Sequence, residues 1–294
     1  MHQSFLSYRR KQYLWIAVAL CGLSIAAYLV HRPRSSPNGG TWLGYTLGTI
    51  GAVLILWLTA LGIRKRSYKS RLGTVQGWVS AHVYLGLALL VIVTLHTGFQ
   101  FGWNVHTLAY ALMVLVIVSG IVGISAYLRL PTEMSANRAS LTREQMWAEL
   151  SDLDQRCVRV AAKLPPEFRD AASSNRDRTR VGGSAWMVLA GVDRSQVLLP
   201  AGAGAGALLR ANPDQSLVLE WLAAEQARSS DGERTRAVGE LISLVSARRV
   251  VLKRLRRDAQ IRGWLEVWLY VHVPASLGLL GALVAHVVSV FFYW

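Results

Sequence analysis

The chain has 294 residues, a formal charge of +15 and a positive mean hydropathy of +0.31. No Asp or Glu occurs in residues 1–128, whereas residues 129–262 carry most of the charged side chains. This distribution is typical of a membrane protein with one water-soluble segment. The two cysteines form no CxxCH, CxxC or four-cysteine pattern. Their arrangement excludes attached c-type haem and protein-bound iron–sulfur clusters in this chain.

The excess of basic residues lies beside apolar stretches and is not interleaved with aromatic residues. Basic residues in that position favour membrane insertion and contact with anionic lipid. A single strand of nucleic acid is instead held by a basic groove with aromatic side chains on which the bases stack. We therefore expect membrane lipid, and no nucleic acid, as a partner.

Five apolar stretches are long enough to cross a membrane, which takes about 20 helical residues. Tryptophans stand at their ends, where an amphipathic ring prefers the membrane interface. The five predicted spans are 13–30, 42–63, 77–99, 105–128 and 264–293.

The polar segment 129–262 is predicted to be mainly helical. Thr142 and Gln145 form a capping-box pattern at the start of a helix, which Pro165 and Pro166 end. Short strands are expected at 185–192 and at 196–199.

Helical periodicity resumes at Ser216, and 233–262 is expected to continue as one helix into the fifth span. The predicted fold is therefore an all-α membrane protein with a bundle of five transmembrane helices. A mainly α or α+β cytoplasmic insertion lies between the fourth and fifth helices. The domain limits are 1–128 for the first four spans, 129–262 for the insertion and 263–294 for the fifth span.

Loop charges predict the orientation in the membrane. Three basic residues precede the first span, five follow the second, and none lies in the loop at 100–104. Because cytoplasmic loops are rich in Lys and Arg, the N-terminus and the loop at 64–76 are expected on that side. The segment 129–262 is then also cytoplasmic, the C-terminus is outside, and the third and fifth spans run parallel. We expect an integral protein of a bacterial cytoplasmic membrane.

Four histidines lie inside these two parallel spans. His82 and His96 are fourteen residues apart on the third span, and His272 and His286 are fourteen apart on the fifth. Fourteen helical residues advance about 21 Å and return the side chain to within about 40° of its first direction. His82 is therefore expected to pair with His272 near the cytoplasm, and His96 with His286 near the outer side.

Two histidines from facing helices can hold the iron of a b-type haem through its two axial positions. We therefore predict two haem b groups, with His82 and His272 as ligands of the inner one and His96 and His286 of the outer one. A simple ion fits less well, because two histidines about 21 Å apart cannot share it. Proton handling, or buried histidines with only a structural role, remain alternatives.

Two further groups of residues are expected near these sites. Gly86 and Gly278 lie near the predicted ligands in sequence, where a porphyrin face needs close approach to the backbone; tight helix packing is the alternative explanation. Gln100, Asn104 and His106 lie near the predicted outer site and are candidates for a quinol-binding site.

The two histidine pairs on the third and fifth spans resemble the di-haem cores of cytochrome b and of the ferric reductase-like transmembrane family. The resemblance implies two haems and electron transfer, and it covers about 77–128 and 264–294. The chain differs in having five predicted spans and an insertion of about 130 residues. We therefore expect other proteins to supply the two ends of the electron path.

The expected function is that of a b-type di-haem electron-transfer subunit of an oxidoreductase complex. It would carry electrons across the membrane between a cytoplasmic or quinol donor and a partner redox protein. Expected partners are a cytoplasmic flavoprotein or iron–sulfur protein, or a cytochrome on the outer side. Two alternatives remain open: a membrane quinol dehydrogenase or ferric-reductase-like enzyme in its own right, and a transporter of haem or ions with transient histidine ligands.

Overall fold

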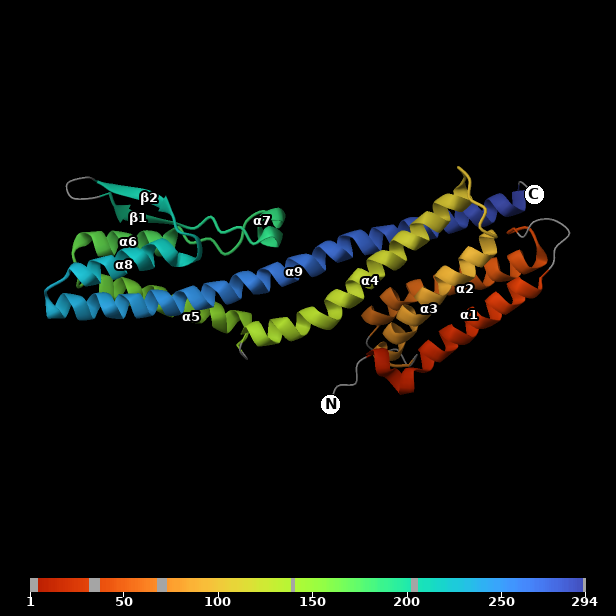
Figure 1. Ribbon diagram of the computed structural model, residues 1–294, viewed down its shortest axis with the longest axis horizontal. Coiled ribbons are helices and arrows are strands. Elements are labelled where there is room, and N and C mark those ends of the chain that lie inside the picture. The colour runs from red at the N-terminus through yellow and green to blue at the C-terminus, as the bar shows by residue number, and fades with distance from the viewer. Residues whose placement is uncertain (1–4, 32–37, 68–72, 139–140, 202–205, 293–294) are drawn as a thin grey trace. The chain divides into compact units, whose positions relative to one another are not determined.

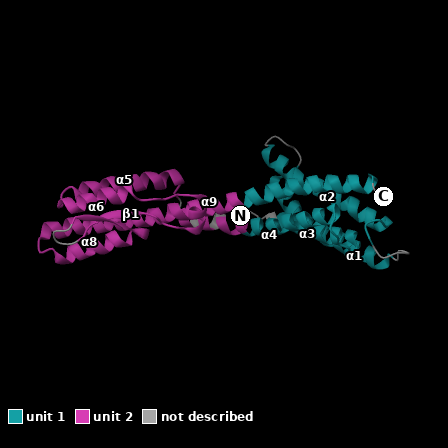
Figure 2. Ribbon diagram, turned by 90° about the horizontal axis from the view of Figure 1, so that it is seen from above, with its two compact units in different colours: residues 1–125, 268–294 teal, residues 126–267 magenta. Residues whose placement is uncertain are grey.

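The computed structural model describes residues 5–31, 38–67, 73–138, 141–201 and 206–292. Contacts divide the chain into two compact units (Figure 2). The first, Met1–Ser125 with Trp268–Trp294, is called the span unit here, and the second, Ala126–Val267, is called the inserted unit. Part of the predicted basic loop at 64–76 lies outside the described residues, as does the C-terminal residue.

Five helices in the described residues are long and apolar enough to cross a membrane. A short 3₁₀ segment, η1 (Phe5–Lys11), precedes the first of them. The five long apolar helices are α1 (Gln12–Val30), α2 (Trp42–Arg66), α3 (Val75–Thr97), α4 (Val105–Arg138) and α9 (Gly232–Phe292). The five predicted apolar helices are thus confirmed, and such helices are compatible with an integral membrane protein.

The ends of α2 and α3 follow from local sequence. The hydroxyl of Thr41 accepts a hydrogen bond from the backbone N–H of Gly44, and Thr74 caps Gly77 in the same way. Each cap satisfies a donor that has no partner inside the helix. Gly98 ends α3 in the left-handed conformation with φ of +58°, which glycine adopts without a steric penalty.

The helices of the span unit pack around a shared apolar core. In Figure 1, α1, α2 and α3 lie side by side. Ile92 of α3 is fully buried there, and Met113 of α4 and Leu279 of α9 belong to the same cluster. Many large apolar side chains of the same helices face outward, such as Leu23 and Val284. An apolar exterior of this kind is suited to contact with lipid.

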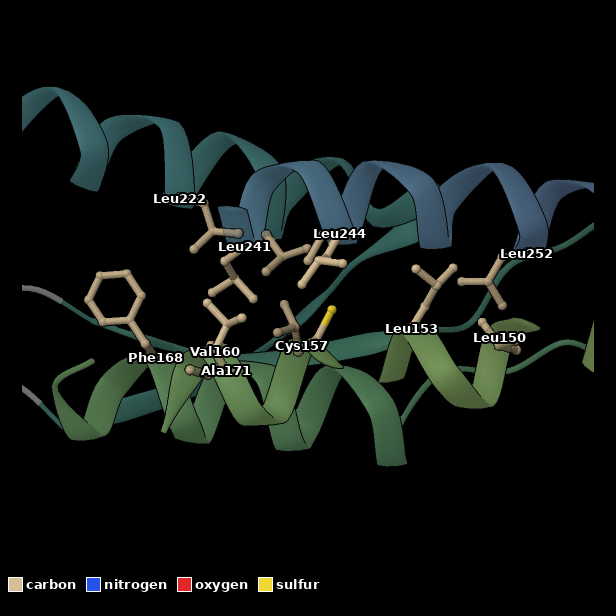
Figure 3. Close-up of a cluster of buried hydrophobic side chains, with 14 of the residues drawn as sticks. Leu150, Leu153, Cys157, Val160, Phe168, Ala171, Leu222, Leu241, Leu244 and Leu252 are labelled. Carbon is tan, nitrogen blue, oxygen red and sulfur yellow. The ribbon is translucent and has the colours of Figure 1, made fainter. Parts of the chain in front are cut away.

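In the described residues, the inserted unit contains four shorter helices, one 3₁₀ turn and one strand pair between the end of α4 and the first part of α9. These elements are α5 (Arg143–Ala161), α6 (Pro166–Asp177), α7 (Ala185–Ala190), β1 (Gln196–Pro200), β2 (Ala207–Ala211), η2 (Pro213–Gln215) and α8 (Ser216–Arg228). Strands β1 and β2 are antiparallel. Figure 3 shows Leu153 and Cys157 of α5 pointing toward Leu241 and Leu244 of α9 across the core of this unit.

Most sequence predictions for this segment are confirmed. The capping box of Thr142 and Gln145 is present, β1 covers the predicted strand at 196–199, and α9 is one continuous helix. The strand predicted at 185–192 is wrong, because α7 is a helix. A short apolar run does not distinguish the two structures by periodicity. The cap from Ser184 and the left-handed Gly191, with φ of +66°, select the helix.

Candidate cofactor site

All four histidines predicted as haem ligands belong to the span unit and are half-buried. Helix α3 positions His82 and His96, and α9 positions His272 and His286. The ring centroids of His96 and His286 are 6.0 Å apart, with an angle of 84° between the ring planes. His82 of α3 and His272 of α9 belong to the same unit. The structure thus brings together His96 and His286, the pair predicted for the outer site.

Each histidine of α3 forms a hydrogen bond to helix α2 through its Nδ1 atom. His82 Nδ1 lies 3.0 Å from the carbonyl oxygen of Leu58, and His96 Nδ1 lies 2.7 Å from that of Gly44. A carbonyl oxygen can only accept, so Nδ1 carries the proton in both rings. The Nε2 atom of each neutral ring therefore keeps its lone pair, which is the form that binds a metal.

Helix α4 holds His272 in an equivalent way. The Ser119 hydroxyl lies 2.7 Å from His272 Nδ1 and donates its own proton to the carbonyl oxygen of Val116 at 2.8 Å. Because its single proton is used there, Ser119 accepts from His272 Nδ1. The indole of Trp268 also stacks on the His272 ring and donates to the Ser119 carbonyl at 2.8 Å. Nε2 of His272 is thus also left as the free nitrogen.

His286 has a histidine as its partner. Its Nδ1 lies 2.5 Å from Nδ1 of His106, which is near the start of α4. One of these two nitrogens donates and the other accepts. If His286 is to present Nε2 as the other three do, His106 must accept at Nδ1 and carry its own proton on Nε2.

Glycines leave room for the rings. A Cβ atom on Gly48 of α2 would lie 2.7 Å from Cε1 and 2.9 Å from Nδ1 of His96. A Cβ atom on Gly120 would lie 3.6 Å from His272, and one on Gly123 only 2.1 Å from Trp268. Side chains larger than hydrogen at Gly48 and Gly123 would displace these aromatic groups.

Gly86 and Gly278, the two glycines predicted from the sequence to lie beside the haems, have less crowded surroundings. A Cβ atom on Gly86 would meet only Leu58, at 4.0 Å, and one on Gly278 would meet nothing within 4 Å. Neither glycine therefore makes room for a histidine ring. Gly278 is exposed, with open space beside it.

A cavity of about 650 Å³ opens beside His96 and His286. This volume is within the usual range for sites of cofactors and other small molecules. Its apolar wall includes Met113 of α4 and Leu283 of α9. The polar residues that line it are Asn38, Tyr45, Thr49, His96, Thr97, Gln100, Asn104, His106, Thr107, Tyr110 and His286.

Sequence reasoning missed several of these residues. Ser119 has a side chain that is common in apolar spans, and nothing near it in sequence connects it to His272. Gly44, Gly48 and Gly51 recur on one face of α2, and this stripe of small residues was the available signal for close helix contact. In the part of the chain that the structure describes, no group of three or more His, Cys, Asp or Glu side chains is arranged to hold a metal ion.

Comparisons with models of known protein families, with curated proteins and with solved structures found no match to this chain.

Proposed function

We propose that the chain is a di-haem b-type membrane protein that carries electrons across the bilayer. His82 and His272 would hold the inner haem, and His96 and His286 the outer one. A bound haem supplies a reversible one-electron carrier. Two histidines per iron leave no open coordination position, which suits electron transfer better than chemistry at the metal.

The observation that carries this proposal is how the histidine rings are held. His82, His96 and His272 each use Nδ1 for a hydrogen bond to a neighbouring helix and keep Nε2 free. Metal-binding histidines characteristically donate their second nitrogen in this way, which sets the tautomer and the ring direction.

The separation within the outer pair also supports the proposal. Two histidines that would hold one haem iron must lie close together, beside a space large enough for the cofactor. The centroids of His96 and His286 are 6.0 Å apart, and both rings line the cavity of about 650 Å³. The two rings are therefore positioned where they could hold one haem together.

The distance between the two sites along the helices would let electrons cross most of the membrane. Fourteen helical residues separate the histidines on each helix, which is about 21 Å of a hydrocarbon core roughly 30 Å thick. From the basic residues at the end of α2 and in the loop that follows, we propose that the N-terminus and the inserted unit face the cytoplasm. The redox partners would be a flavoprotein or iron–sulfur protein on that side, or a cytochrome outside.

Haem content tests the function. The chain purified after expression with added haem should bind about two b haems by pyridine-haemochrome analysis. His82→Ala and His286→Ala should each retain about one, because each removes one ligand pair only. A redox titration of the two variants should then show different midpoint potentials, since different haems remain.

His31→Ala is the matched control. His31 lies at the end of α1, where its ring meets that of Trp42 edge to face. This variant should keep both haems. Absence of haem from the unmodified chain, or unchanged haem content in His82→Ala and His286→Ala, would rule out the proposal.

A second candidate function is quinol oxidation by the chain itself. Gln100, Asn104 and His106 line the same cavity as His96 and His286 and offer polar groups beside the outer pair. If this function is correct, a soluble quinol analogue should reduce the haem of the isolated chain without a partner protein. Reduction only after a partner is added would assign the chain to electron transfer alone.

A further inference from the structure

Helix α7 is an entirely apolar helix that the inserted unit buries only in part. Its six residues have the sequence AWMVLA, and none of them is buried. Trp186 is 75% exposed, and Val192, just beyond the helix, is 51% exposed. Contiguous apolar side chains are rarely left in water, and such a patch marks a surface that contacts something else.

The helix is nevertheless held in a defined place. Ser184 caps its first turn, and Gly191 ends it in the left-handed conformation. The Gln260 side chain of α9 donates a hydrogen bond to the Leu189 carbonyl oxygen at 2.9 Å. The Leu189 side chain packs over Gly263, where a Cβ atom would lie 3.3 Å from it. Helix α7 is therefore fixed against one short stretch of α9.

That stretch immediately precedes the apolar part of α9. Gln260 and Gly263 stand four residues and one residue before Trp264, where the predicted span begins. At 1.5 Å per helical residue, Gln260 is about 6 Å from Trp264 along the axis. Trp264 is itself 51% exposed, as expected for a tryptophan at a membrane interface. Helix α7 thus lies at the level where α9 would enter the membrane.

We propose that α7 lies in the lipid headgroup region and anchors the inserted unit to the membrane surface, with Trp186 as the inserted side chain. A short apolar segment with an exposed tryptophan suits this region, because the indole is apolar with one polar N–H. The exposed Arg180 and Arg194 flank α7 in sequence and would favour anionic headgroups. This inference requires only that α9 spans a membrane, and it does not depend on haem.

A fluorescent label at position 186 tests the contact in the full-length chain. Cysteine replaces Trp186 in a Cys21→Ala background, and a polarity-sensitive dye is attached. Burial leaves Cys157 5% exposed and raises the pKa of its thiol to about 11. Because the thiolate is the reactive form, Cys157 should remain unlabelled at pH 7. The labelled chain is reconstituted into equimolar phosphatidylcholine and phosphatidylglycerol vesicles.

Leu208→Cys on β2 provides the matched control. Leu208 is 51% exposed and pairs with Leu199 of β1. Strand β1 is joined to α6 by a hydrogen bond from the Leu198 N–H to the Ser174 hydroxyl. The backbone carbonyl of Asn175, the next residue of α6, accepts a hydrogen bond from the Arg248 side chain of α9. Arg248 stands sixteen residues before Trp264. Sixteen helical residues correspond to about 24 Å, so this apolar side chain should lie beyond the headgroups.

The label at 186 should emit at shorter wavelength in vesicles and be quenched by lipids that carry a spin label near the headgroup. The label at 208 should remain quenchable by aqueous iodide. A label at Val192→Cys, which keeps Trp186 in place, should behave like that at 186. Equal iodide quenching at 186, 192 and 208 would overturn the proposal. Protection at 186 that vanishes on dilution of the protein in lipid would also overturn it, because a second copy would then be the partner.

Discussion

Replacing Gly48 by alanine is expected to remove the outer haem and leave the inner one, which lowers the haem content from about two per chain to about one. The added Cβ atom would stand 2.7 Å from Cε1 of His96, too close for any real contact. The ring must move, and its hydrogen bond to the Gly44 carbonyl, now 2.7 Å long, would be lost. Without that bond, neither the tautomer nor the direction of His96 is set.

Gly62→Ala is the control for this prediction, because it makes the same change in the same helix. A Cβ atom on Gly62 meets nothing within 4 Å. Alanine is also the better helix former, by about 1 kcal/mol, so any general effect on α2 should be stabilising. Pyridine-haemochrome analysis and low-temperature optical spectra give the measurement. Two haems in Gly48→Ala would show that the His96 ring does not bind the outer haem from its present position.

Arg248→Met should have the largest effect on the stability of the inserted unit, a loss of about 3–5 kcal/mol. The Arg248 side chain is 2% exposed and forms an ion pair with Asp154. It also donates hydrogen bonds to the Gln215 side chain at 2.7 Å and to the Thr179 hydroxyl at 3.1 Å. Methionine has a similar length but no donors, so the Asp154 carboxylate and the Gln215 side-chain oxygen would lose the Arg248 donor inside the unit.

Arg249→Met separates this effect from a general loss of charge in α9. Arg249 pairs with Asp214, but both side chains are more than 40% exposed. Exposed pairs contribute about 1 kcal/mol or less. Hydrogen exchange of the α5 amides in the full-length chain measures the free energy of opening for this unit. Equal effects of the two substitutions would contradict the role given to Arg248.

Local sequence was sufficient for most of the helices. Long apolar runs between tryptophans indicated the five spans, and the capping box at Thr142 placed the start of α5. The absence of strong helix breakers from 233 to 262 indicated that α9 begins well before its apolar part. The error at α7 has the same local origin, because an apolar run of six residues with glycines on both sides is compatible with either a strand or a helix.

The candidate site was predictable only in its main residues. A spacing of fourteen places both histidines of a helix on one face, and the loop charges predicted that the two helices run parallel. Together they led to the prediction that His82 pairs with His272 and His96 with His286. The partners of the rings could not be found in this way. Leu58 and Gly44 contribute carbonyl groups, which every residue has, and Ser119 is remote in sequence from His272. Gly86 and Gly278 were selected for their nearness in sequence, whereas Gly48 is the glycine that touches a ring.

The sequence by itself determined the number of apolar helices and which histidines share a helix face. Both properties depend on residues that lie close together in one segment of the chain. The tertiary structure decided which ring nitrogen is free, which glycine borders His96 and that His106 meets His286. It also decided that the apolar α7 stays exposed beside the start of the span. Each of these depends on contacts between helices that are distant in sequence, and such contacts are selected by packing of the whole unit.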